Sequence, residues 1–341
     1  MKILTNNDMI GMAQVLDVPA VTSLPHLEGL IEKSGSTFTE NDTIIVSGSG
    51  LGAAADSLSR KNVVYGLTEW ADEINQSIAK KITLAVMLGM EIPDYRIVDT
   101  MQEMDDLCAN GYYPISKNVA IKRTHGLSIT VEAFYNYGKF SNYFIRVSGD
   151  RLLYGNVGPM VPNALTCTFS MPNAALKPWF QKLAGIISER SPNYKGPVTI
   201  TGLVFKDSCI YQDIHFGYNY DYELAKHCLC GLGSITNEAK IPKGYATTIR
   251  LYDIREEGLR LRGSGKYLFP LHCSADSEKQ SIVSTGETPI VAVGLGEKIV
   301  TAYNNAYEEI KKVKTQELCY RPDGGRYAVE WWKKAKQAGI L

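Results

Sequence analysis

The sequence lacks a net charge, a long apolar run and a regular cysteine spacing. Its 36 basic residues balance 36 acidic ones, which does not favour a protein that neutralises nucleic-acid phosphates. No apolar stretch approaches the roughly 20 residues that span a bilayer, and the N-terminus lacks the basic-then-apolar pattern of a signal peptide. The seven cysteines contain no C-x-x-C pair, so a disulfide framework is not expected. We expect a cytoplasmic monomer or homodimer without a nucleic-acid or membrane partner.

Common catalytic motifs are absent as well. The chain contains no Walker loop, no H-E-x-x-H, no G-x-S-x-G and no paired-carboxylate motif. What remains is an ordinary globular composition, with 45% hydrophobic and 21% charged residues among 341. This balance excludes a largely disordered chain, and the length suits two or three domains.

The first hundred residues alternate short apolar runs with amphipathic stretches. The runs are at 2–4, 19–22, 43–46 and 63–65, and helices are expected at 9–16, at 27–33, from residue 53, and as one long helix ending at 88. This alternation predicts a parallel sheet covered by helices. The glycines of the loop Gly48-Ser49-Gly50 let the backbone approach a phosphate or carboxylate, although a tight structural turn explains them as well.

After residue 93 the runs become shorter and richer in Tyr, Thr, Ser, Asn and Gly. Antiparallel strands are expected at 119–123, 129–135, 142–147 and 152–154, with a hairpin formed by 198–205 and 208–216. Helices are expected at 174–190, 221–232 and 302–313, and a β-rich region begins at 245. Trp331 and Trp332 are expected to pack inside the chain, with contact to a partner as the alternative.

Several segments resemble, in the same order, the phosphoribosylamine–glycine ligase family, ATP-grasp enzymes of purine synthesis. Residues 42–66 resemble that family's third strand, substrate loop and fourth strand. The other segments, with the family's motif after each, are Ile92-Pro93-Asp94-Tyr95 (G-I-P-x-x-x-Y), Thr130-Val131-Glu132-Ala133-Phe134 (I-E-E-F), Asn156-Val157-Gly158-Pro159-Met160 (N-T-G-G-M), Ile214-His215-Phe216-Gly217 (V-R-F-G) and Tyr320-Arg321-Pro322-Asp323-Gly324-Gly325 (Y-R-x-D-I-G). Each match is short, and their collinear order carries the resemblance.

The resemblance implies an α/β and α+β fold in three parts. These are an N-terminal Rossmann-like parallel sheet (1–95), a reduced ATP-grasp central domain (96–244) and a small C-terminal β-rich lobe (245–341). It also implies an ATP-dependent carboxylate–amine ligase with ATP and Mg²⁺ as cofactors and a small-molecule carboxylate and amine as substrates. In such enzymes the carboxylate attacks the γ-phosphate to form an acyl phosphate, and the amine then displaces phosphate.

The resemblance also implies roles for individual residues. The substrate-binding residues would be Gly48, Ser49, Gly50, Asn156, Gly158 and Met160. Glu132 and Phe134 would lie against the adenine, and Asp213 would hold magnesium. The catalytic residues would be Arg321, Asp323 and His215, which stands where the family has an arginine; a hydrogen-bonded strand residue is the alternative for His215. Lys117 and Lys122 would contact the phosphates, although a solvated strand edge explains these two lysines equally well.

The sequence departs from the family mainly around the nucleotide. Only 119–129 is available for the family's glycine-rich flap and its supporting subdomain. The family's magnesium pair becomes Tyr211 and Asp213, or Gln212 and Asp213 with a shift, which leaves one carboxylate for hard cations that prefer several oxygen ligands. A second function therefore stays open: a pseudoenzyme deficient in nucleotide binding that keeps the ligase fold as a small-molecule-binding or interaction protein.

Overall fold

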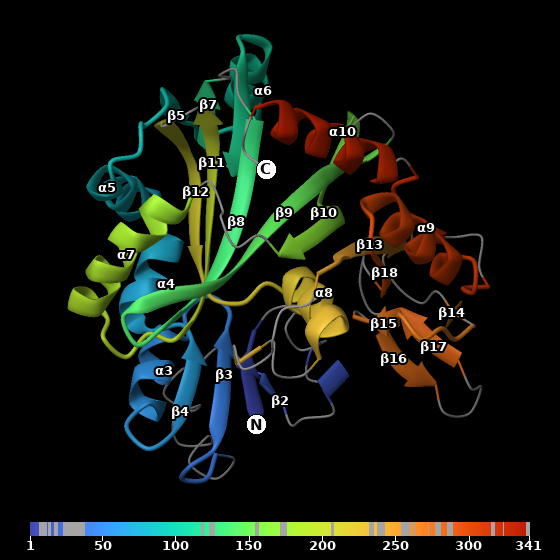
Figure 1. Cartoon of the computed structure of the whole chain (residues 1–341), viewed down its shortest axis with the longest axis horizontal. Helices are drawn as coiled ribbons and strands as arrows, with labels where there is room; N and C mark the ends of the chain where they lie inside the picture. The colour runs from blue at the N-terminus through green and yellow to red at the C-terminus, as the bar shows by residue number, and fades with distance from the viewer. Residues whose placement is uncertain are drawn as a thin grey trace.

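The computed structural model shows one long curved sheet and three smaller sheets around it (Figure 1). It describes residues 1–6, 12, 15–16, 20–22, 38–116, 119–122, 127–153, 157–170, 176–205, 208–231, 235–236, 243–253, 260–261, 263–271, 273–276, 281–284, 289–314, 318–322 and 324–338. No helix in these ranges is long and apolar enough to cross a membrane.

The N-terminal sheet is parallel, as expected. Its strands are β1 (Lys2–Thr5), β2 (Ala20–Thr22), β3 (Thr43–Ser47) and β4 (Val63–Gly66), in the order β2-β1-β3-β4. Its helices are α3 (Gly52–Leu58), α4 (Glu69–Gln76) and α5 (Ile78–Leu88). The single helix expected to end at 88 is two helices, because the extended Ser77 ends α4 and caps Lys80 N of α5. Of the helix expected at 9–16, only residues 12 and 15–16 are described, and the helix expected at 27–33 lies outside the described residues.

A small lobe follows, which the sequence pattern did not reveal. It contains the small sheet of β5 (Tyr95–Ile97), β6 (Tyr112–Ser116) and β7 (Val119–Lys122), in the order β5-β7-β6, and helix α6 (Met101–Ala109). A capping box between Thr100 and Glu103 begins α6. The lobe has its own apolar cluster, formed by Val98, Met104, Tyr112 and Ala120.

The large sheet joins the central and C-terminal parts of the chain. Its strands are β8 (Leu127–Asn136), β9 (Lys139–Leu153), β10 (Val157–Ser170), β11 (Gly196–Phe205), β12 (Ser208–Phe216), β13 (Tyr245–Asp253), β15 (Leu268–Pro270) and β18 (Ile290–Gly296), with β19 (Leu318–Cys319) beside β13. The order is β12-β11-β8-β9-β10-β13-β18-β15. The expected hairpin of β11 and β12 is confirmed. The β10–β13 pair carries the sheet across the domain boundary expected at 244, and that boundary stays a prediction.

The remaining elements complete the C-terminal part and cover the large sheet. They are β14 (Arg260–Leu261), β16 (Cys273–Asp276), β17 (Ser281–Ser284), α7 (Lys177–Arg190), α8 (Tyr220–Cys230), α9 (Ile299–Ile310) and α10 (Gly324–Gln337). Pro178 lies in the first turn of α7, where the missing N–H has no helical partner.

One face of the large sheet forms the main core. Val131, Ala133 and Tyr135 of β8 alternate onto this face, which packs against α4, α5, α7 and α10. Trp331 of α10 donates its Nε1–H to Ser128 O at 2.8 Å, and Trp332 stacks under Lys336. Both tryptophans therefore pack within the chain. The parallel N-terminal sheet, the antiparallel centre and the β-rich C-terminal part confirm the expected fold class.

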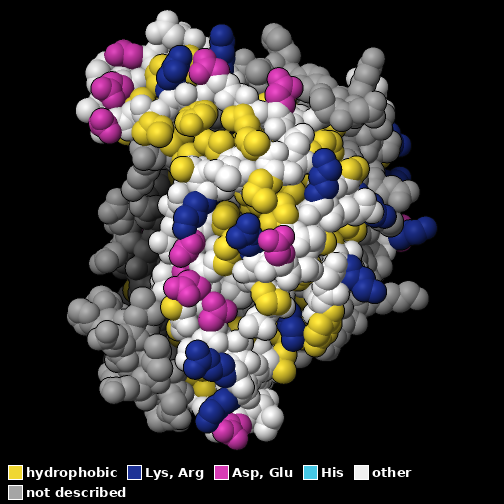
Figure 2. All heavy atoms as spheres, turned by 90° about the vertical axis from the view of Figure 1, so that its left-hand side faces the viewer, with side chains coloured by type: hydrophobic (Ala, Val, Ile, Leu, Met, Phe, Trp, Pro, Cys, Tyr) yellow, Lys and Arg dark blue, Asp and Glu magenta, His cyan; other side chains and the backbone are white. Residues whose placement is uncertain are grey.

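Figure 2 shows the outer side of this helical layer, where charged side chains of both signs are interspersed. Exposed apolar side chains gather near the small lobe. Val86 and Met87 of α5 are 58% and 53% exposed, and Ile97 and Met101 of the lobe are 64% and 68% exposed.

Candidate active site on the polar face of the large sheet

The second face of the large sheet is polar where the first is apolar. Residues that alternate with the core side chains, such as Thr130 and Glu132 of β8, point to this second face. The strand register aligns one row across β12, β11, β8, β9 and β10, formed by Asp213, Thr201, Thr130, Arg146 and Thr168. The neighbouring row is formed by His215, Thr199, Glu132 and Phe144. We call this surface the polar face.

Helix α8 covers one half of the polar face, which we call the covered half. In Figure 1, α8 lies between the N-terminal sheet and the large sheet. Its Asp221 accepts two hydrogen bonds from Arg250 of β13, at 3.1 Å from Nε and 2.7 Å from Nη2. The ring of Tyr222 lies 3.7 Å from the guanidinium carbon of Arg146, at the edge of this half. These contacts hold α8 against β9 and β13.

Three further buried charged residues of the covered half form a triad: Glu132, Lys226 and Glu223. The Lys226 ammonium lies 2.6 Å from Glu132 Oε1 and 2.8 Å from Glu223 Oε1, and all three residues are 3% exposed or less. Burial raises the pKa of Glu223 to about 8. Burial lowers the pKa of Lys226, but the Glu132 and Glu223 charges outweigh this and the net shift is upward. The carboxylate expected at the adenine is therefore engaged by a lysine.

Three threonine hydroxyls on the covered half have no hydrogen-bond partner among the residues that the structure describes. Thr166 and Thr168 of β10 and Thr248 of β13 are at most 2% exposed, and the Oγ1 atom of each is unsatisfied. Such a group costs about 1–3 kcal/mol when buried. The register places Thr166 directly opposite Thr248, so the hydroxyls lie close together. Stability alone does not account for this choice of residues.

The other half of the polar face, which we call the open half, is only partly buried. It contains Thr130, Thr201, Asp213 and His215. Lys81 reaches it from α5, and its Nζ donates to Asp213 Oδ1 at 2.7 Å. The Thr130 and Thr201 hydroxyls are 3.1 Å apart. Burial lowers the pKa of His215, so its imidazole is neutral at neutral pH.

The residues around Asp213 do not fit a magnesium ion. Magnesium demands near-octahedral oxygen coordination and is usually bound by one or two carboxylates together with waters and substrate phosphates. Here the single carboxylate already holds an ammonium group, and the hydroxyls of Thr130 and Thr201 bond to each other. Within the part of the chain that the structure describes, no three His, Cys, Asp or Glu side chains are grouped as metal ligands.

The glycine loop has a structural reason for its residues. Gly48 has a φ of 119°, and a Cβ built there would meet Asn6 Oδ1 at 1.6 Å. Asn6 donates from Nδ2 to Ser49 O at 2.6 Å, which ties the loop to the end of β1. Gly50 has a φ of 81° and open space around its Cα. Glycine is thus required by the turn, and contact with a substrate stays a prediction.

Other predicted site residues are dispersed. Phe134 is buried with its ring centroid 6.1 Å from that of Tyr65, and Lys122 is exposed at the end of β7. Gly158 and Met160 lie in β10. Asn156, Lys117 and Asp323 lie outside the described residues.

Arg321 is not brought together with His215. It is fully buried, and a Cβ built at Gly149 of β9 would meet its Nη1 at 2.2 Å. Gly149 pairs with Leu165, whose side chain belongs to the main core. The Arg321 guanidinium therefore lies on the core face of the large sheet, whereas His215 lies on the polar face.

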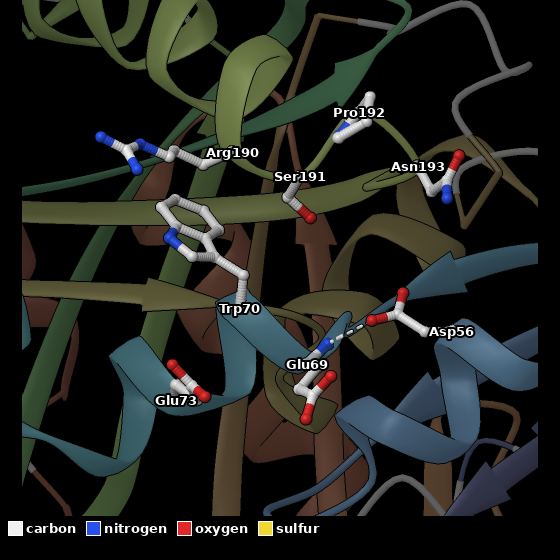
Figure 3. A pocket seen from close by; sticks show the side chains of 8 residues that line it. All are labelled: Asp56, Glu69, Trp70, Glu73, Arg190, Ser191, Pro192 and Asn193. Atoms are coloured by element: carbon white, nitrogen blue, oxygen red, sulfur yellow. Dashed lines mark hydrogen bonds between the residues drawn. The ribbon is translucent and has the colours of Figure 1, made fainter.

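A groove of about 300 Å³ lies elsewhere, between α3, α4 and the end of α7 (Figure 3). It is lined by Asp56, Glu69, Trp70, Glu73, Arg190, Ser191, Pro192 and Asn193. Asp56 Oδ2 of α3 accepts a hydrogen bond from Glu69 N of α4 at 2.9 Å, which joins these two helices at the groove. No predicted site residue lines this groove.

Comparison with known proteins supports the fold assignment. No model of a known protein family matches the sequence, and a search of curated proteins gives no match. Among solved structures, the chain is similar to a phosphoribosylamine–glycine ligase from Thermotoga maritima, with 15% identity, a TM-score of 0.69, and coverage of 94% of this chain and 99% of that chain.

Two biotin carboxylase structures are also similar. A biotin carboxylase domain of a single-chain bacterial carboxylase has 11% identity and a TM-score of 0.60, with 99% of each chain covered. That of the Hydrogenobacter thermophilus 2-oxoglutarate carboxylase, a dimer in complex with MgADP, ADP and bicarbonate, has 9% identity, a TM-score of 0.62 and coverage of 99% and 98%. All three are ATP-grasp enzymes. The chain therefore has an ATP-grasp fold, and the resemblance to phosphoribosylamine–glycine ligase is confirmed at the level of the fold.

Proposed function

We propose that the protein is an ATP-dependent carboxylate–amine ligase that works on the open half of the polar face. The observation that supports this most is the contrast between the two faces of one sheet. The core face is apolar, while hydroxyls, charges and a neutral imidazole line the other face at a site that stays partly open. An ATP-grasp fold over nearly the whole chain supplies the reaction class.

The proposed reaction has two steps. A substrate carboxylate oxygen attacks the γ-phosphorus of ATP, the bond to ADP breaks, and an acyl phosphate forms. The amine nitrogen then attacks the acyl carbon, and the bond to phosphate breaks. Lys81 and Arg146 stabilise the phosphoryl charge, and neutral His215 accepts the proton that the amine loses.

The test combines ATP calorimetry with phosphate release screened against carboxylate and amine pairs. The His215→Gln variant is expected to lower the turnover number by about 10²–10⁴ while ATP affinity changes less than about twofold. Lys80→Met is the matched control, because Lys80 lies on α5 beside Lys81 and bonds to Glu73 away from the site. Full turnover in His215→Gln would remove His215 from the reaction.

A second function has its own support. The Glu132 carboxylate is sealed by Lys226 under α8, which leaves less room for a nucleotide base than the resemblance implies. In this alternative the chain is a pseudoenzyme deficient in nucleotide binding that acts as a small-molecule-binding or interaction protein. Calorimetry at millimolar ATP separates the two: absence of heat, with or without magnesium, would leave only the alternative.

A further inference from the structure

A lysine side chain supplies a positive charge in the open half. Lys81 projects from α5 onto Asp213, with its side chain 14% exposed against 48% for Asp213. The ammonium is thus the more deeply set partner of the pair. Because α5 packs on the core face through Leu84 and Leu88, the position of Lys81 is fixed by the main core.

A second cation stands in the same row of the sheet. Arg146 is three strands from Asp213, which corresponds to about 14 Å at the usual strand spacing. Its guanidinium is oriented by the Tyr222 ring and by a hydrogen bond to Asn163. Between Asp213 and Arg146, the described residues of this row are Thr201 and Thr130, which both carry hydroxyls. The electrostatic effects of Lys81, Arg146 and Asp213 all reach His215, so these groups share one site.

We propose that Lys81 and Arg146 hold the anionic end of the ligand directly, where a related enzyme would use a divalent cation held by protein carboxylates. The donor set around Asp213 does not fit that cation, and the ammonium already neutralises the carboxylate that would bind it. The ligand class is a polyphosphate or phosphoryl anion that binds without a protein-held metal. The identity of the anion rests on the proposed function; the binding mode rests on the row of side chains.

Calorimetry with inorganic tripolyphosphate and with ATP, each in EDTA and in excess magnesium, tests this. Metal-free tripolyphosphate and ATP are expected to bind at least as tightly as their magnesium complexes. Lys81→Met is expected to weaken both in EDTA by about tenfold, the loss of one good ionic contact. Lys80→Met, one residue away and bonded to Glu73, is expected to stay within about twofold of wild type.

The Asp213→Asn variant gives opposite results under the two binding modes. If Asp213 neutralises Lys81, removing its charge frees the ammonium and tightens metal-free tripolyphosphate binding, by about threefold or more. If Asp213 holds a metal, the same variant loses affinity for MgATP and gains none in EDTA. The second result would overturn the inference.

The outcomes also separate this inference from the proposed function. Binding of MgATP alone, with none in EDTA, overturns the inference and leaves the ligase function standing. Tripolyphosphate binding in EDTA that depends on Lys81 supports the inference. If ATP then binds no more tightly than tripolyphosphate, the nucleotide is removed from the proposed function. Absence of binding for both anions under both conditions overturns both.

Discussion

The covered and open halves of the polar face belong to the same sheet and follow the same alternation of side chains, yet their ion pairs differ in how deeply they are buried. In the covered half, the Asp221–Arg250 pair is almost fully buried, and Lys226 contacts two glutamates. In the open half, the Asp213 carboxylate of the Lys81–Asp213 pair is 48% exposed. Charges removed from water depend on their partners, whereas exposed pairs are stabilised partly by solvent. We therefore expect the covered half to contribute to fold stability, and we propose that the open half binds the ligand.

The largest expected effect is that of Lys226→Met. This substitution leaves the Glu132 carboxylate buried without a counter-charge and removes the partner of Glu223, and breaking a buried pair in this way costs about 3–5 kcal/mol. Urea denaturation followed by circular dichroism measures it. Lys80→Met, which breaks an exposed pair, serves as the control and is expected to change the free energy of unfolding by less than about 1 kcal/mol. Equal effects of the two variants would contradict the division into halves.

A pH dependence of intermediate size is expected from Glu223. Its folded-state pKa of about 8 lies above the ordinary value of 4.5, so between these values the folded chain holds a proton that the unfolded chain has released. The contribution of Glu223 to the free energy of unfolding is fully present below about pH 4.5 and is lost as the pH rises through 8, by at most about 1.4 kcal/mol per pH unit.

The measurement is urea denaturation of wild type and Glu223→Gln at several values between pH 5 and 8. Burial lowers the pKa of His215 and His227, and these groups act in the opposite direction. The difference between wild type and variant is therefore the quantity to follow. A difference that does not change with pH would show that Glu223 does not titrate in this range.

The smallest expected effect on stability is that of Asp213→Asn. The carboxylate is half exposed, so the loss of its pair with Lys81 is expected to cost about 1 kcal/mol or less. The same variant is expected to tighten the binding of metal-free tripolyphosphate. A loss of stability as large as that of Lys226→Met would show that Asp213 is a structural charge, and it would contradict the distinction between the covered and open halves.

Local patterns predicted those elements whose signals lie within a few residues. The β11–β12 hairpin was found from two β-branched runs and a short turn, and the parallel N-terminal sheet from alternating runs. Helix α6 was not found, although Thr100 and Glu103 form a capping box, because the helix has only 9 residues and lies in a region interpreted as strands. The break at Ser77 was also missed, since serine occurs both inside helices and at their caps.

The candidate site was less predictable than the fold. The resemblance pointed to Glu132, Asp213 and His215, and the structure places all three on one face, but it gives Glu132 a buried lysine partner and Asp213 a partner from α5. Lys81 and Lys226 had no local mark of function. A lysine in an amphipathic helix is usually solvated, and only its distant partner reveals another role.

Alternation along β8 to β12 determined that one sheet face would be apolar and the other polar, because side chains of a strand point to opposite sides in turn. The sequence by itself thus determined the layers and the residue types on each. Only the tertiary structure decided that α8 would cover half of the polar face, that Lys81 would meet Asp213 across 132 positions of sequence, and that Arg321 would lie on the core side. These contacts depend on how distant elements pack, and the energy of each charge depends on the water that this packing excludes.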